Sequence, residues 1–154
     1  MRPTSRGRAA KVLLVEDNPG DAHLTIRALR SAKVVNEQNV DVVEDGEKAL
    51  AYLRQQGAYR DRARPDLVLL DLNLPKVDGC AVLKVVKADP DLRRIPVIVI
   101  TGSPAAEDEF LRSSDLHANA YVRKPAKRAD VMNVADSIRG FWFSEATQPW
   151  RKSK

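Results

Sequence analysis

The sequence predicts an α/β fold, a doubly wound five-stranded parallel sheet. Two wholly apolar runs, 67–70 and 97–100, are too short for helices and suit strands that are buried on both faces. Apolar residues recur at helical spacing between the expected strands, so that strand and helix alternate five times. The length of 154 residues fits one ordinary domain, and no internal repeat is present.

Turn residues mark the first two strand–helix units. Residues 11–15 form the first expected strand, and Asn18 is a suitable N-cap for a helix that begins at Pro19. Residues 40–43 form a short second strand, after which Asp45 opens a second helix. Both helices have an apolar face at helical spacing, formed by Ala22, Ile26 and Leu29 in the first and by Ala49, Leu50 and Leu53 in the second.

The remaining strands and helices are marked by turn residues in the same way. A polar surface loop is expected over 56–64, before the third strand, and Asp89-Pro90 ends the third helix. Ser103-Pro104 starts a fourth helix, and 120–122 is the fifth strand. The inward residues of the last three helices are Val82, Leu83 and Val86, then Phe110 and Leu111, and finally Val131, Val134, Ile138 and Trp142.

The net charge of +5 comes from the two ends of the chain. Seven of the 26 basic residues lie in 1–11 and 151–154, where no acidic residue occurs, so 12–150 holds 19 basic and 21 acidic residues. We expect 1–10 to be a disordered basic tail, 11–143 the folded domain and 144–154 a C-terminal extension. No base-reading motif indicates sequence-specific binding of nucleic acid.

The cysteine count and the lengths of the apolar runs indicate the cellular environment of the protein. Cys80 is the only cysteine, which excludes an internal disulfide and a cysteine metal site, and we expect it to be a small core residue. The apolar run 12–15 is too short for a signal-peptide core, and no run approaches the length of a membrane span. We therefore expect a cytoplasmic protein with no membrane contact.

Polar residues follow four of the five expected strands. These are Glu16 and Asp17, Asp71, Thr101 and Lys124, in chain order. Because the carboxyl ends of parallel strands share one edge of the sheet, these side chains are expected to converge there. Three carboxylates at one place repel each other unless a cation is present, and oxygen ligands without His or Cys suit Mg²⁺.

Such a group can perform phosphoryl transfer. Asp71 is an ionised nucleophile at neutral pH, and Lys124 stabilises charge on the transferring oxygens. Thr101 can donate a hydrogen bond to a phosphoryl oxygen, and Gly102 leaves room for the group. Each residue also has a purely structural explanation, as an acidic helix cap, a turn residue, a strand-end hydroxyl or a surface cation. The occurrence of all these residues at strand ends is what favours a role in phosphoryl transfer.

These residues resemble the motif of the receiver domain of two-component response regulators. The matching positions are Glu16-Asp17, Asp71, Thr101 and Lys124-Pro125, together with Pro75 and Gly79 in the turn after the third strand. The resemblance covers 11–143, which makes this segment the receiver domain, and implies a flavodoxin-like (βα)5 fold. It further implies a phosphorelay protein rather than a separate enzyme, one that catalyses its own aspartyl phosphorylation and dephosphorylation.

The resemblance also implies roles for individual residues. Asp71 would accept the phosphoryl group from a sensor histidine kinase or a small phosphodonor. Asp17 and Asp71 would bind Mg²⁺ through their side chains, Asn73 through its backbone carbonyl and Glu16 through water. Tyr121, three residues before Lys124, matches the aromatic switch position that is coupled to Thr101; its alternative role is an aromatic residue packed in the sheet.

Two short segments resemble one particular group within this family. Residues 115–121 and Phe141-Trp142-Phe143 are similar to small stand-alone regulators that partner bacterial phytochromes. That group implies a homodimer through the fourth helix, fifth strand and fifth helix, and the aromatic chain end favours a partner surface. The alternative is a last helix that covers only its own domain.

Two other functions must be weighed. A phosphohydrolase with an aspartyl-phosphate intermediate would usually place a carboxylic acid two residues after the nucleophile, where this chain has Asn73, which cannot deliver a proton. A flavin or nucleotide carrier would need a phosphate-binding loop after the first strand, where Glu16-Asp17 would repel phosphate.

Overall fold

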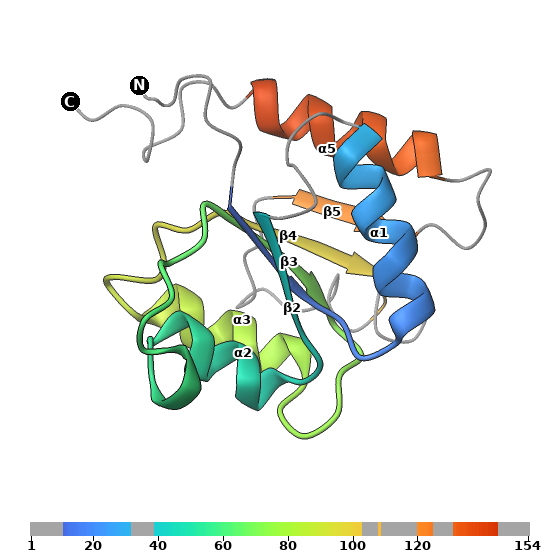
Figure 1. Cartoon of the computed structure of the whole chain (residues 1–154). Coiled ribbons are helices and arrows are strands. Elements are labelled where there is room, and N and C mark those ends of the chain that lie inside the picture. The colour runs from blue at the N-terminus through green and yellow to red at the C-terminus, as the bar shows by residue number, and fades with distance from the viewer. Residues whose placement is uncertain (1–10, 32–38, 103–107, 109–119, 125–130, 145–154) are drawn as a thin grey trace.

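The five expected strands form one parallel sheet between two layers of helices. The computed structural model describes residues 11–31, 39–102, 108, 120–124 and 131–144. The strand order is β2-β1-β3-β4-β5, and every neighbouring pair is parallel. Helices α1 and α5 cover one face of the sheet, and α2 and α3 cover the other (Figure 1). This is the doubly wound fold that the sequence predicts.

The elements lie where the apolar runs and turn residues place them. The strands are β1 (Val12–Val15), β2 (Val40–Val43), β3 (Leu67–Asp71), β4 (Val97–Thr101) and β5 (Ala120–Arg123). The helices are α1 (Pro19–Ser31), α2 (Gly46–Leu53), the short 3₁₀ helix η2 (Gly57–Tyr59), α3 (Gly79–Ala88) and α5 (Val131–Ser144).

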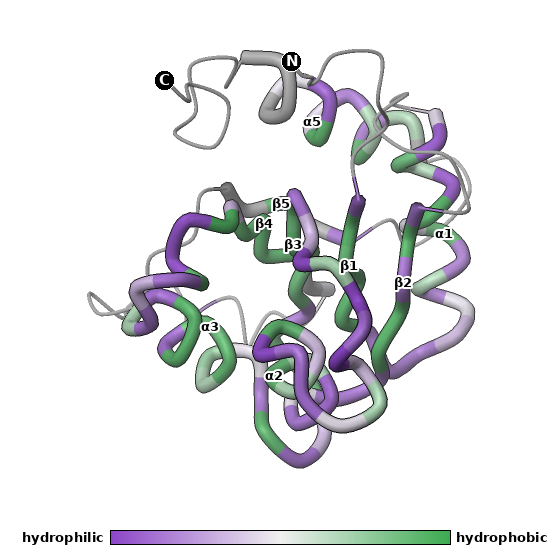
Figure 2. Tube along the Cα trace, turned by 60° about the vertical axis from the view of Figure 1, so that its left-hand side comes forward, coloured by the Kyte–Doolittle hydropathy of each residue, from purple (hydrophilic) through white to green (hydrophobic). Residues whose placement is uncertain are grey.

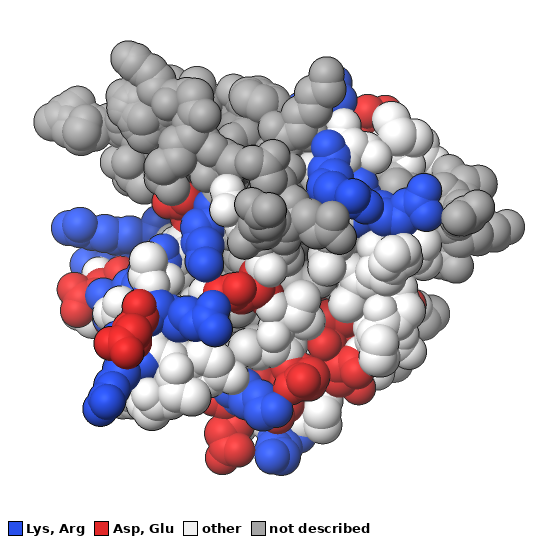
Figure 3. Space-filling view, viewed as in Figure 1, with Lys and Arg blue, Asp and Glu red and all other residues white. Residues whose placement is uncertain are grey.

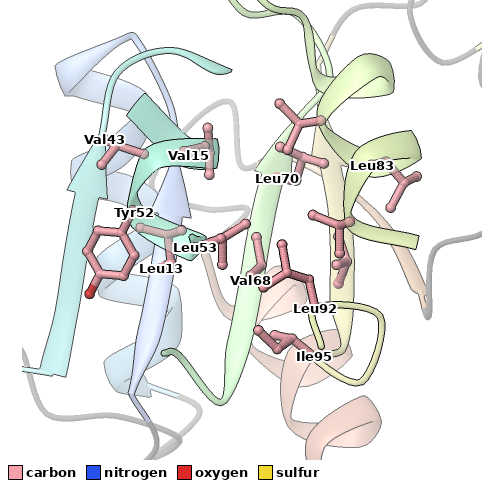
Figure 4. Close-up of a cluster of buried hydrophobic side chains, with 14 of the residues drawn as sticks. Leu13, Val15, Val43, Tyr52, Leu53, Val68, Leu70, Leu83, Leu92 and Ile95 are labelled. Carbon is pink, nitrogen blue, oxygen red and sulfur yellow. The ribbon is translucent and has the colours of Figure 1, made fainter. Parts of the chain in front are cut away.

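The strands are continuously apolar because both faces of the sheet are covered. Every residue of β1 and β3 is buried. Alternate residues enter two separate cores, as the pleat of a strand requires. Leu13 and Val68 join the core beneath α2 and α3 (Figure 4), whereas Leu14 and Leu69 join the core beneath α1 and α5. Figure 2 shows the hydrophobic residues concentrated on the central strands.

Short polar side chains begin three of the helices. The Asn18 side chain accepts a hydrogen bond from the Asp21 N–H at the start of α1 (2.9 Å), as its sequence position predicts. Asp45 accepts one from the Lys48 N–H at the start of α2 (2.7 Å). Asp78 does the same for α3 with the Ala81 N–H (2.9 Å). These caps fix the direction in which the chain leaves the carboxyl ends of β1, β2 and β3.

Some expectations are corrected by the structure. The loop expected over 56–64 contains the 3₁₀ helix η2, because a turn of hydrogen bonds forms around Gly57, which has a positive φ of 58°. Cys80 is half-buried at the margin of the α2–α3 core rather than fully inside it. The fourth helix with Phe110 and Leu111, the tail 1–10 and residues 145–154 lie outside the described residues. Within the described ranges, no helix is long and apolar enough to cross a membrane.

One ion-pair cluster ties the amino end of the sheet together. Asp41 of the edge strand β2 receives a hydrogen bond from the Tyr52 hydroxyl of α2. The same carboxylate lies 3.1 Å from the Lys11 Nζ before β1 and 3.0 Å from the Arg62 guanidinium after η2. Partial burial raises the pKa of Asp41, but these three donors lower it more, so that the net pKa is depressed. Tyr52 itself is fully buried in the α2–α3 core.

Tyr52→Phe tests the contribution of this cluster to stability. The variant keeps the buried ring and loses only the hydrogen bond to a charged partner, so it should lower the free energy of unfolding by about 1–2 kcal/mol. Urea unfolding measures the change. Tyr59→Phe is the matched control, because Tyr59 packs against Tyr52 with ring centroids 5.2 Å apart without contacting Asp41; an equal loss in the two variants would refute the assignment.

Candidate functional site

The residues expected to carry chemistry lie at the carboxyl edge of the sheet. Glu16 directly follows β1, Asp71 ends β3, and Lys124 follows β5. Val15 pairs with Leu70 in the sheet, which places Glu16 beside Asp71 on adjacent strands. The strand ends lie beside the start of α1 (Figure 1), and acidic side chains gather in this part of the surface (Figure 3). The sheet therefore brings together groups that are more than fifty residues apart.

Three carboxylates share a small space at this edge. Glu16, Asp17 and Asp71 each offer an oxygen, and these oxygens all lie within 4.8 Å of one another. Glu16 and Asp71 are only 2% and 1% exposed, whereas Asp17 faces solvent. The convergence that the sequence predicts is confirmed for these side chains.

The local backbone orients the two buried carboxylates. One oxygen of Glu16 accepts a hydrogen bond from the Asn18 N–H (3.1 Å). One oxygen of Asp71 likewise accepts one from the Asn73 N–H (3.0 Å). Each side chain is thus anchored to the loop that follows it, and its other oxygen, Oε1 of Glu16 or Oδ2 of Asp71, is left for the shared space.

Lys124 is the cation among these groups. Its Nζ lies 2.9 Å from Glu16 Oε1, 3.0 Å from Asp71 Oδ2 and 2.9 Å from Asp21 Oδ2. Burial lowers the pKa of Lys124, but its close contacts with the Asp21, Glu16 and Asp71 carboxylates raise it more, and the net shift is upward. The ammonium therefore stays charged, with a carboxylate for each of its three donors.

The two free carboxylate oxygens fit a divalent cation. Glu16 Oε1 and Asp71 Oδ2 are fully buried and accept no hydrogen bond of regular geometry from any described group, although the Lys124 ammonium is close. Buried oxygens in this condition are uncommon and need a further partner. With the exposed Asp17 they form a set of hard oxygen ligands, which suits Mg²⁺ or a similar ion.

Glu16 is electrostatically strained when no metal is bound. Burial raises the pKa of Glu16 to about 7, and the nearby Asp71 charge adds to the rise, whereas the close Lys124 ammonium and the Asn18 N–H oppose it. At neutral pH the carboxyl group is therefore poised between its neutral and ionised forms. A cation at this place would favour the ionised form.

Glu16→Gln tests this strain through the pH dependence of stability. In the folded metal-free protein Glu16 holds its proton up to a pH of about 7, while the ordinary value that applies to the unfolded chain is 4.5. The folded state binds the extra proton in this window, so Glu16 lowers the free energy of unfolding as the pH rises from about 4.5 to 7. The wild type should lose on the order of 2 kcal/mol more than the Gln variant across this range.

Urea unfolding of both proteins at pH 5 and pH 7.5, with a chelator present, measures the difference. Equal changes with pH in the two proteins would show that the buried carboxylate of Glu16 is not under strain.

Two glycines allow the backbone to approach the site closely. A Cβ atom at Gly79 would clash with the backbone of Asp71 and Leu72, so only glycine lets α3 begin directly against the end of β3. Gly102, at the end of β4, lies next to the stem of Lys124, where a Cβ would be 3.7 Å from Lys124 Cβ and Cδ, an ordinary contact. The described neighbour of Gly102 is thus the Lys124 stem. The expectation that Gly102 makes room for a phosphoryl group stays a prediction.

The backbone places the two proposed switch residues, but not their side chains. Thr101 is the last residue of β4 and pairs with Arg123, and Tyr121 in β5 pairs with Val99. The side chains of Thr101 and Tyr121 lie outside the described part of the structure, as does Pro125. The position of Thr101 at the carboxyl edge agrees with the sequence prediction.

Asp21 is a member of the site that sequence reasoning missed. It lies in the first turn of α1 and contacts Lys124 across 103 positions of sequence. One signal was available, because the first turn of a helix after β1 must lie at the same edge as the strand ends. That edge also borders a cleft of about 360 Å³ between α1 and β2, lined by Glu16, Asp17, Pro19, Ala22, His23, Ile26, Val42 and Glu44.

Comparison with protein families identifies the family of the domain. Residues 12–136 match the response regulator receiver domain. The chain belongs to this family. It is therefore a response regulator of a two-component system, whose partner is a histidine kinase, and receiver domains of this kind bind a divalent metal.

Individual relatives are similar over nearly their whole length. Response regulator Rcp1 of Synechocystis sp. is 42% identical over 138 residues, which cover 90% of this chain and 92% of Rcp1. The crystal structure of the phosphorylated cyanobacterial phytochrome response regulator RcpA is 46% identical with a TM-score of 0.80, covering 92% of this chain and 99% of RcpA. The Mn²⁺-bound form of Rcp1 is 41% identical with a TM-score of 0.77, covering 91% and 99%. The receiver fold and the similarity to phytochrome response regulators that the sequence predicts are thus confirmed.

Proposed function

We propose that this receiver is an Mg²⁺-dependent phosphorylation switch with Asp71 as its phosphoacceptor. The supporting observation is the position of Asp71, which ends a buried strand with one oxygen anchored by the Asn73 N–H and the other facing Lys124 and the neighbouring carboxylates. The likeness to Rcp1 and to phosphorylated RcpA supports the same assignment. On that likeness the donor is a histidine kinase of the phytochrome type.

We propose the metal ligands that the resemblance to receiver domains implies. Asp17 and Asp71 would hold Mg²⁺ through their side chains, Asn73 through its backbone carbonyl and Glu16 through water. Mg²⁺ bound there neutralises carboxylate charge and stabilises the oxygens of the transferring phosphoryl group. The Mn²⁺-bound structure of Rcp1 and the burial of two free carboxylate oxygens in this chain support the proposal.

The chain's own residues divide the remaining work. An Asp71 oxygen forms a bond to phosphorus as the bond from phosphorus to the donor's histidine nitrogen, or to the acetate oxygen of acetyl phosphate, breaks. The leaving group keeps that electron pair. Lys124, already 3.0 Å from Asp71 Oδ2, donates to the phosphoryl oxygens, and the Thr101 hydroxyl donates a second hydrogen bond. In self-catalysed dephosphorylation, a water oxygen bonds to phosphorus while the bond from phosphorus to the Asp71 oxygen breaks, which regenerates the carboxylate and releases inorganic phosphate.

The output is a change of surface rather than a second reaction. Thr101 would turn toward the phosphoryl group and Tyr121 would fill the space that it leaves, which favours one of two surface conformations. We propose that residues 11–143 form the receiver domain, with 1–10 and 144–154 as flanking segments, and that the protein acts in the cytoplasm. The readout is protein–protein contact, including a homodimer through the fourth helix, β5 and α5, which a mass measurement in solution can test.

Asp71→Asn tests the phosphoacceptor. Incubated with acetyl phosphate and Mg²⁺, the wild type should gain the mass of one phosphoryl group, and Asp71→Asn should gain none because an amide is not a comparable nucleophile. Intact-mass spectrometry reads the result. Asp91→Asn, which removes an exposed carboxylate elsewhere, should behave as the wild type. A wild type that acquires no adduct contradicts the proposed function.

Asp17→Asn tests the metal site. Removing this exposed carboxylate should weaken Mg²⁺ binding by about tenfold, because a charged oxygen ligand is replaced by a neutral one. Calorimetric titration measures the dissociation constant. Glu47→Gln, which removes an exposed carboxylate from the first turn of α2, should leave it near the wild-type value. Unchanged affinity in Asp17→Asn would remove Asp17 from the site.

A further inference from the structure

Lys124 has three carboxylate partners, and only one of them is independent of the metal site. Glu16 and Asp71 belong to the group of oxygens that fits a divalent cation. Asp21 does not belong to that group, yet its Oδ2 lies as close to Lys124 Nζ, at 2.9 Å, as any other partner. Among the described residues, Asp21 is therefore the one partner that Lys124 keeps when Glu16 and Asp71 are engaged elsewhere.

The site places competing demands on Glu16 and Asp71. Their free oxygens face the Lys124 ammonium when no metal is present, and the same oxygens are the ones available to a cation. Once these carboxylates are shared with a divalent ion, their attraction for the ammonium falls, and two positive centres within a few ångströms repel each other. The ammonium would then leave the site unless another negative group held it.

We propose that Asp21 is a positioning residue that holds the Lys124 ammonium beside Asp71 while Glu16 and Asp71 are engaged by a divalent cation. This inference rests on the proposed function of Asp71. Its consequence is that Asp21, which touches neither the phosphoryl group nor the metal, sets how fast the phosphoryl group is transferred.

The surroundings of Asp21 suit this role. Its N–H donates to the Asn18 side chain, which fixes its backbone in the first turn of α1. The positive end of the helix dipole stabilises a carboxylate at that position. The Asp21 side chain is 36% exposed and keeps part of its hydration, whereas the Lys124 side chain is only 13% exposed. The stem of Lys124 passes beside Gly102, where an added Cβ would lie 3.7 Å from Lys124 Cβ and Cδ.

The first experiment compares phosphorylation rates at saturating Mg²⁺ with acetyl phosphate as the donor. Asp21→Asn keeps the size of the side chain and removes its charge, and it should slow transfer by about threefold to tenfold because the loosened ammonium stabilises the transition state less. Asp21→Glu restores a carboxylate and should recover most of the rate. Glu47→Gln is the matched control, since it also removes a first-turn helix carboxylate but contacts Lys76 rather than Lys124.

The second experiment follows Lys124 itself and does not depend on phosphorylation. The protein is treated with an amine-reactive ester, with and without Mg²⁺, and peptide mass spectrometry measures modification of Lys124. In the wild type and in Glu47→Gln, Lys124 should stay protected when Mg²⁺ is added. In Asp21→Asn, addition of Mg²⁺ should raise its modification by about threefold or more, because Asp21 is the carboxylate outside the metal site that holds Lys124 among the described residues.

The outcomes separate this inference from the proposed function. A wild type that acquires no phosphoryl group overturns the function of Asp71. A wild type that is phosphorylated, together with an Asp21→Asn variant that matches it in rate and in Lys124 modification, overturns the positioning role alone. A slow variant whose Lys124 remains protected also overturns it, because the loss would then arise from the structure of α1 rather than from the ammonium.

Discussion

The site depends on one charge balance, that of a single ammonium among carboxylates that would otherwise repel one another. Glu16 and Asp71 are almost completely removed from water, so each carboxylate loses much of its hydration, which costs free energy. Lys124 offsets part of this cost through its close contacts with both carboxylates. One positive charge cannot neutralise all the carboxylates around it, and the remaining negative charge is what attracts a divalent cation.

The fold prevents this strain from relaxing. Glu16 and Asp71 extend two strands whose residues are wholly buried, and each carboxylate is also held by the N–H group of the loop beyond it. The start of α3 presses against the carbonyl of Asp71, a contact that only Gly79 permits. The packed core beneath therefore supplies the rigidity that keeps like charges together at the edge of the sheet.

The two ends of the sheet use ionic groups in opposite ways. At the amino end, Asp41 has three donors, from Tyr52, Lys11 and Arg62, and its pKa is depressed. At the carboxyl end, Glu16 has fewer donors than its burial requires, and its pKa is raised. The cluster around Asp41 stabilises the fold, whereas the carboxyl edge around Glu16 would be stabilised by a bound cation. The stabilising ion pairs and the candidate reactive site thus lie at opposite ends of the strands.

The sequence by itself determined the α/β fold, the strands and the edge at which Glu16, Asp17, Asp71 and Lys124 meet. It could do so because buried parallel strands are continuously apolar and place their carboxyl ends together. Only the tertiary structure decided which groups touch, as in the contact of Asp21 with Lys124 and the hydrogen bond from Tyr52 to Asp41. It also decided how deeply Glu16 is buried. Contact distance and burial arise from packing between distant segments, and no local pattern of residues encodes them.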